Sequence, residues 1–219
     1  MKPVAVETEG NLEDQWEAIA MTGMLVKVPP SCTVTPEQFE HLAAANPELR
    51  LELTAAGRLI VMSPTGSEGG RQNARLTIAI GNWALTSRAG EIFDSSTGFT
   101  LPNGAIRSPD VAWIEQSRWD ALPPQQRKGF APICPDFVLE LASETDDIEE
   151  LRDKMQEYID NGCRLGWSID PRTGWVEIYR GDRPVERLKS PQVLSGEAVL
   201  VGLEIQLDKL FPEGFEPQP

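Results

Sequence analysis

Two carboxylates on neighbouring predicted strands are the strongest candidates for a catalytic or metal-binding pair in this sequence. Asp110 follows Pro109 at the start of one strand, and Glu140 lies 30 positions later inside a strand that is otherwise apolar. An acid within an apolar strand needs a partner or a metal, because burying an isolated charge is costly. Acids on adjacent strands can share one face of a sheet, so we expect these two to meet around a single cation.

Mg²⁺ prefers such a donor set, and Mn²⁺ is an alternative. The ion takes one or two carboxylates, a carbonyl such as that of Leu141, and waters or phosphate oxygens. Lys154 lies on the following predicted helix, with Tyr158 four residues later and therefore on the same face. A lysine beside a scissile phosphate can orient water and offset developing charge. The alternative is a solvated helix face on which Glu150 and Lys154 form an ordinary pair.

Three other acids are weighed against the first two. Asp136 also follows a proline, but four residues of strand separate it from Glu140 by roughly 13 Å. One Mg²⁺ therefore cannot bridge these two directly. Glu52, on a predicted hairpin, and Glu68, at the start of a predicted helix, are each interpreted either as a further site carboxylate or as plain exposed acids.

The elements that must position these residues follow from caps and periodicity. Thr35 and Gln38 form a capping-box pattern with Pro36 at the first helical position, which predicts a helix over 36–45. A helix predicted over 146–160 lies between two strands, which implies a crossover between parallel strands beside antiparallel hairpins. The fold class is therefore α/β with a mixed central β-sheet flanked by helices and added β-hairpins. The other predictions are a long helix over 68–87, a loop over 115–132, short strands and turns over 184–211, and strands at 49–53, 58–62, 91–94, 98–101, 109–114, 137–141, 164–169 and 175–179.

Length and composition indicate one domain with short extensions. The 219 residues suit a single core, which we place at 35–212 after an N-terminal arm at 1–34 and before a tail at 213–219. Trp113, Trp167 and Trp175 are expected to fill the core. No apolar run is long enough to span a bilayer and the start lacks a signal-peptide pattern, so we expect a cytoplasmic protein without a membrane partner. The 3 cysteines offer neither a disulfide framework nor a zinc spacing.

The net charge of −14 argues against a polyanionic partner. The charge is uneven, since residues 1–49, 50–135 and 136–219 carry −6, +2 and −10. A locally basic cleft is compatible with this distribution, because exposed charges are screened over roughly 8 Å at physiological salt. Any nucleic-acid contacts are therefore expected from the middle segment, with Arg71, Arg75, Arg107, Arg127 and Lys128 as candidates.

The sequence resembles the Uma family of restriction-endonuclease-like proteins, within the PD-(D/E)xK nuclease superfamily. The resemblance covers roughly residues 35–211 and rests on five pieces in order: Val61-Met62-Ser63-Pro64, Ser108-Pro109-Asp110-Val111, Pro135-Asp136-Phe137-Val138-Leu139-Glu140, Lys154-x-x-x-Tyr158 and Gly166-Trp167-Ser168-Ile169-Asp170-Pro171. It implies a restriction-endonuclease-like fold, with Asp110 and Glu140 as metal ligands. The position two residues after Glu140, where the superfamily has its lysine, is Ala142; in the Uma pattern the helix supplies the lysine, which points to Lys154.

The resemblance implies a Mg²⁺-dependent endonuclease that hydrolyses DNA phosphodiester bonds. A homodimer is expected because cutting both strands of a duplex needs two sites. The first alternative is a catalytically inactive relative that serves as an interaction or binding module, which Ala142 and the acidic charge favour. A second alternative is metal-dependent hydrolysis of a small phosphate ester, which the charge would tolerate better.

Overall fold

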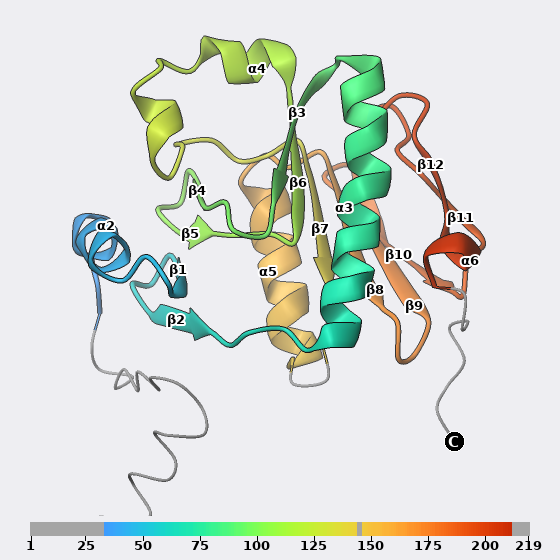
Figure 1. The fold of residues 1–219 in the computed structure, drawn as a ribbon, viewed down its shortest axis with the longest axis horizontal. Coiled ribbons are helices and arrows are strands. Elements are labelled where there is room, and N and C mark those ends of the chain that lie inside the picture. Colours follow the sequence, from blue (N-terminus) through green and yellow to red (C-terminus); the bar gives the residue numbers. More distant parts are fainter. Residues whose placement is uncertain (1–32, 144–145, 212–219) are drawn as a thin grey trace, which may run out of the picture. The chain divides into compact units, whose positions relative to one another are not determined.

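A six-stranded mixed sheet forms the centre of the computed structural model, which describes residues 33–143 and 146–211 (Figure 1). The predicted arm, apart from residues 33–34, and the predicted tail at 213–219 lie outside these residues. Strands β7 and β8 are parallel, whereas every other neighbouring pair is antiparallel. The strands follow the order β10 (Arg183–Lys189), β9 (Trp175–Arg180), β8 (Leu165–Asp170), β7 (Phe137–Leu141), β6 (Val111–Glu115) and β3 (Gly90–Asp94).

Two smaller sheets accompany the central one. A four-stranded sheet has the order β2 (Leu59–Met62), β1 (Arg50–Leu53), β5 (Ile106–Arg107) and β4 (Phe99–Thr100). It contains the predicted hairpin, with Leu51 opposite Val61. The third sheet pairs β11 (Val193–Ser195) with β12 (Glu204–Gln206).

Helix α3 (Ser67–Ser87), predicted as a long helix over 68–87, covers one face of the central sheet (Figure 1). Its buried residues recur at helical spacing, with Leu76, Ile80 and Ala84 turned toward the sheet. They belong to a core that also contains Trp113 and Trp167. Helix α6 (Leu207–Leu210) contributes Leu207 and Leu210 to the same core. This core thus packs α3 against β3 and β6.

Helix α5 (Ile148–Asp160) covers the opposite face and joins the parallel strands β7 and β8, as the crossover prediction required (Figure 1). Asp147 caps its first turn by accepting a hydrogen bond from the Glu149 N–H at 2.8 Å. Met155 and Tyr158 are fully buried in a second core with Val138. The amphipathic pattern of α5 therefore fixes which helix residues face the sheet.

A third, smaller core forms where helix α2 (Pro36–Ala45) packs against the four-stranded sheet. The predicted capping box is confirmed, because the Thr35 side chain accepts from the Gln38 N–H and the Gln38 side chain accepts from the Thr35 N–H. Phe39 is the buried anchor of this helix and packs with Leu53. This packing holds β1 beside the central sheet.

Three predictions about elements need correction. The segment 115–132 is not only a loop, because it contains helix α4 (Gln116–Ala121) and a 3₁₀ turn, η1 (Gln126–Lys128). Trp175 is 40% exposed rather than part of the core, since it stands at the first position of β9 beside Arg187 and Lys189. Strand β5 was not predicted, and it pairs with Leu53 of β1, which is distant in sequence. Within the described ranges, no helix is long and apolar enough to cross a membrane.

Candidate active site

The register of the central sheet brings Asp110 and Glu140 together. Val111 of β6 pairs with Leu139 of β7 in an antiparallel ladder, so one step further along this register Asp110 lies opposite Glu140. Directly opposed residues have their Cβ atoms about 4.5–5.5 Å apart. A second contact fixes the pair, because the Leu141 N–H donates a hydrogen bond to Asp110 Oδ2 at 2.9 Å. The two predicted metal-site carboxylates therefore lie side by side at one end of β7.

Helix α5 places Lys154 at the same end of the strand. Its Nζ lies 2.8 Å from Glu140 Oε1 and 2.9 Å from Glu52 Oε1. Tyr158, one turn later on the buried face of α5, donates its hydroxyl to Glu140 Oε1 at 3.1 Å. Oε1 of Glu140 thus accepts two bonds, whereas Oε2 has no hydrogen-bond partner in the described part of the chain. That oxygen remains available to a ligand.

Glu52 joins the cluster from β1, although it is distant in sequence. Its side chain is buried, and its second carboxylate oxygen pairs with Arg107 Nη1 at 3.1 Å. The Ser108 N–H donates to Glu52 Oε1 at 2.9 Å. Glu52 is therefore buried beside Lys154 rather than exposed, and its role as a site carboxylate stays a prediction. Glu68, by contrast, lies on the surface at the start of α3, where Gln72 donates to it at 2.9 Å.

Two residues that support the site were missed or misread in the sequence. Asn73 of α3 donates its side-chain amide to Asp110 Oδ1 at 3.2 Å. Its spacing from Leu76 and Ile80 places it toward the inner face of the helix, and a polar residue there was the available signal. Arg107 was expected to contact nucleic acid, yet it is buried between Glu52 and Glu157 and is not available to a partner.

Burial and charge shift the site carboxylates in opposite directions. Burial, reinforced by the charges of Asp110 and Glu52, raises the pKa of Glu140 to about 8 despite the nearby Lys154. Burial likewise raises the pKa of Asp110. Burial also acts to raise the pKa of Glu52, but Lys154, Arg107 and the Ser108 N–H outweigh it, so that pKa is lowered. The pKa of Lys154 is raised because the attraction of Glu140 and Glu52 outweighs its burial.

The donor set fits a hard divalent cation. Asp110 and Glu140 are carboxylates, their ionisation is disfavoured by burial, and Glu140 keeps one oxygen without a protein partner. A cation between them would offset this cost, and Mg²⁺ needs only one or two protein carboxylates when waters or phosphate oxygens fill the remaining positions. In the described part of the chain, no three His, Cys, Asp or Glu side chains are arranged as a complete metal-binding group. The residues therefore fit an ion that shares its ligands with substrate and water.

Asp136 lies at the other end of β7 and has a different role. It is 0% exposed, and its Oδ2 accepts the Glu115 N–H at 2.9 Å. Its other oxygen pairs with Arg118 at 2.9 Å and Arg164 at 3.5 Å. These contacts tie β7 to β6 and to the start of β8. The second Pro-Asp pair is therefore a structural group that the Asp110 site does not include.

Comparisons with known proteins add a family and a fold. The model of the Uma2 family, described as "Putative restriction endonuclease", matches residues 36–208. A search of curated proteins gives no match. A crystal structure at 1.96 Å resolution, described as a "putative nuclease belonging to DUF820" from Anabaena variabilis ATCC 29413, is similar with a TM-score of 0.68 and 20% sequence identity. The similarity covers 82% of this chain and 98% of that one, and confirms the predicted mixed α/β fold.

Proposed function

We propose that this chain, which belongs to the Uma2 restriction-endonuclease-like family, is a Mg²⁺- or Mn²⁺-dependent endonuclease that hydrolyses DNA phosphodiester bonds. The observation that carries the proposal is the cluster at the end of β7. There Asp110 lies opposite Glu140, and Lys154 reaches Glu140 and Glu52 within 2.9 Å. Family membership supports the nuclease class. The metal, the DNA substrate and the roles of the residues are proposals made here.

Each residue of the cluster has a distinct role in this proposal. Asp110 and Glu140 hold the metal, with the Leu141 carbonyl as a third candidate ligand. When bound, the metal polarises the phosphate and lowers the pKa of the attacking water. Lys154 orients that water and offsets the negative charge that develops on the phosphate as the water oxygen bonds to phosphorus and the leaving oxygen departs. Glu52 holds the Lys154 ammonium in position.

The proposal includes a homodimer, because cutting both strands of a duplex needs two sites. The acidic surface remains the strongest argument against DNA, since the net charge is −14. The segment 50–135, which carries +2, supplies Asp110 and Glu52 and is therefore the surface on which we expect the duplex. Bound metal would reduce the local negative charge further.

Removing the metal ligands provides the test. Asp110→Ala and Glu140→Ala are expected to abolish cleavage of plasmid DNA in Mg²⁺ or Mn²⁺ and to remove the thermal stabilisation by Mn²⁺. In the wild type that stabilisation is about 2.7 kcal/mol at a concentration 100 times the dissociation constant. In metal-free buffer, removing one of two facing carboxylates relieves repulsion, which offsets part of the cost of the lost contacts with Lys154 and Tyr158 for Glu140, and with Asn73 and the Leu141 N–H for Asp110. Asp136→Asn is the matched control, since it changes a buried acid of the same strand, and should retain activity.

Two outcomes would favour other functions. A wild-type protein that shows no metal-dependent stabilisation and no cleavage would support an inactive binding module, the alternative favoured by Ala142. Metal binding with hydrolysis of small phosphate esters but not of DNA would support the second alternative. Equal activity in Asp110→Ala would refute the site assignment itself.

A further inference from the structure

Arg50 is a cation beside the candidate site whose hydrogen-bonding capacity is largely unused. It opens strand β1 two positions before Glu52, and residues two apart on a strand point to the same face. Its Nη2 donates to the Ser95 carbonyl oxygen at 2.7 Å. Its Nε is buried without an acceptor, and no described carboxylate lies within ion-pair distance of the guanidinium. A guanidinium has five N–H donors, and the Nη1 group, for which no described acceptor is present, is the part that a ligand can reach.

The other cations of the site are each already paired with two carboxylates. Lys154 contacts two carboxylates, and Arg107 pairs with Glu52 and Glu157. Arg50 nevertheless lies close enough to Asp110 for its charge to oppose the rise in that pKa which burial causes. Lys154 is paired with Glu140 and Glu52, whereas no described carboxylate forms an ion pair with Arg50, although the charge of Arg50 also acts on Asp94. Arg50 is therefore the cation of the site that is best placed to bind an incoming anion.

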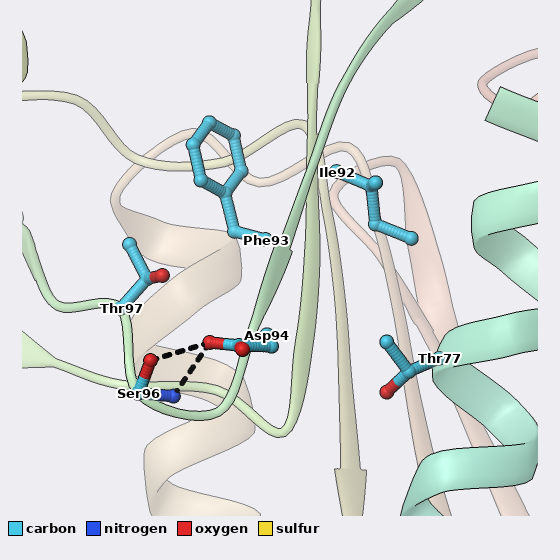
Figure 2. Close-up of a pocket in the computed structure, with 6 residues that line it drawn as sticks. All are labelled: Thr77, Ile92, Phe93, Asp94, Ser96 and Thr97. Carbon is cyan, nitrogen blue, oxygen red and sulfur yellow. Dashed lines mark hydrogen bonds between the residues drawn. The ribbon is translucent and has the colours of Figure 1, made fainter. Parts of the chain in front are cut away.

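A shallow pocket adjoins the turn that anchors Arg50. Ser95 lies between Asp94 and Ser96, which line this pocket together with Thr77, Ile92, Phe93 and Thr97. Figure 2 shows Asp94 turned toward Ser96, whose N–H and hydroxyl it accepts at 3.0 and 2.6 Å. Asp94 pairs with Val111, the residue after Asp110, and Thr77 follows Asn73 by one helical turn. The pocket therefore borders the site on the side of Asp110.

We infer that Arg50 binds a non-scissile backbone phosphate of the nucleic acid beside Asp110, where the strand leaves the site toward the pocket of Thr77, Ser96 and Thr97. This inference rests on the proposed nuclease function and names a substrate contact of the same site. Arginine suits this role, because its planar fork presents two parallel N–H donors to phosphate oxygens. The Ser96 and Thr77 hydroxyls of the pocket already donate to Asp94 and to the Asn73 carbonyl oxygen, so Arg50 is the group that binds the phosphate. Binding there holds the neighbouring phosphodiester over Asp110 and Glu140.

The test measures binding of a short DNA duplex by fluorescence anisotropy in Ca²⁺ between 50 and 200 mM salt. Arg50→Gln is expected to weaken binding about tenfold and to reduce the salt slope by about one phosphate contact. Arg50→Lys, which keeps the charge but not the fork, should fall between Arg50→Gln and the wild type. Arg58→Gln is the matched control, because Arg58 lies on the same hairpin, is exposed, and pairs only loosely with Glu150 at 3.7 Å; it should bind as the wild type does.

The outcomes separate this inference from the proposed function. A wild-type protein that cleaves DNA, with Arg50→Gln and Arg50→Lys both binding duplex at wild-type affinity and slope, overturns the Arg50 inference alone. A wild type that neither binds nor cleaves DNA overturns both. Inorganic phosphate forms the last arm: if it stabilises the wild type but not Arg50→Gln while duplex fails to bind, Arg50 is a small-anion site and the backbone assignment is wrong.

Discussion

Replacing Lys154 by methionine tests the centre of the proposed site. Methionine keeps most of the side-chain length and removes the charge that contacts Glu140 at 2.8 Å and Glu52 at 2.9 Å. Only 12% of the Lys154 side chain is exposed, so water cannot replace the ammonium. The change leaves Glu140 without a cationic partner, whereas Glu52 keeps Arg107 at 3.1 Å.

The magnitude follows from these contacts. Removing one partner of a buried pair destabilises a protein by 3–5 kcal/mol, and the remaining Arg107 pair puts the expected loss near the lower end, at about 3 kcal/mol. For a chain of this size that loss lowers Tm by about 6–12 °C. A divalent ion can supply the missing charge, so Mn²⁺ should stabilise Lys154→Met at least as strongly as it stabilises the wild type. Cleavage should nevertheless fall by at least about 10²-fold, because transition-state stabilisation is lost.

The assay combines thermal unfolding with and without Mn²⁺ and single-turnover cleavage of a duplex. Lys209→Met is the matched control, since Lys209 lies exposed on α6, and both its Tm and its cleavage rate should match the wild type. A Lys154→Met protein with wild-type Tm and wild-type cleavage would refute the reasoning. Loss of Mn²⁺ binding without a separate effect on rate would make Lys154 a structural residue.

Two further predictions concern groups around the site and in the sheet. Asn73→Ala removes one of the two described hydrogen bonds to Asp110, so we expect the affinity for Mn²⁺, measured by calorimetry, to fall about 10- to 100-fold; an unchanged affinity would contradict the positioning role. Burial acts to raise the pKa of Glu177, but Arg152, Tyr179 and Arg187 outweigh it, so that pKa is lowered. The ionised form of Glu177 therefore stabilises the fold above a pH of roughly 4.5, and this stabilisation is lost as the pH falls. Glu177→Gln should therefore cost about 1–2 kcal/mol in urea unfolding at pH 7 and progressively less as the pH falls below 4.5, and a constant difference would argue against the ion pairs as its cause.

The sequence by itself determined the elements whose signals are local. Helix α2 begins and ends as predicted. Its capping box joins residues only three positions apart, and Pro47 follows shortly after its last residue. Strand β7 matches its predicted range because five consecutive residues carry the apolar pattern that a doubly covered strand requires. The helical period likewise placed Lys154 and Tyr158 on one face of α5. Segment 115–132 was mistaken for a loop because α4 buries no residue and so lacks such a pattern.

Packing of the helices and sheets brings some of the candidate acids together and separates others. Asp110 and Asp136 both follow a proline, yet the β6–β7 register places one opposite Glu140 and gives the other to Arg118 and Arg164. Glu52 reaches Lys154 across about a hundred positions of sequence, and Asn73 reaches Asp110 across 37. Such contacts join residues that are distant in sequence, and bringing them together costs loop-closure entropy. They therefore form only when the helices and sheets pack, and no local sequence pattern predicts them.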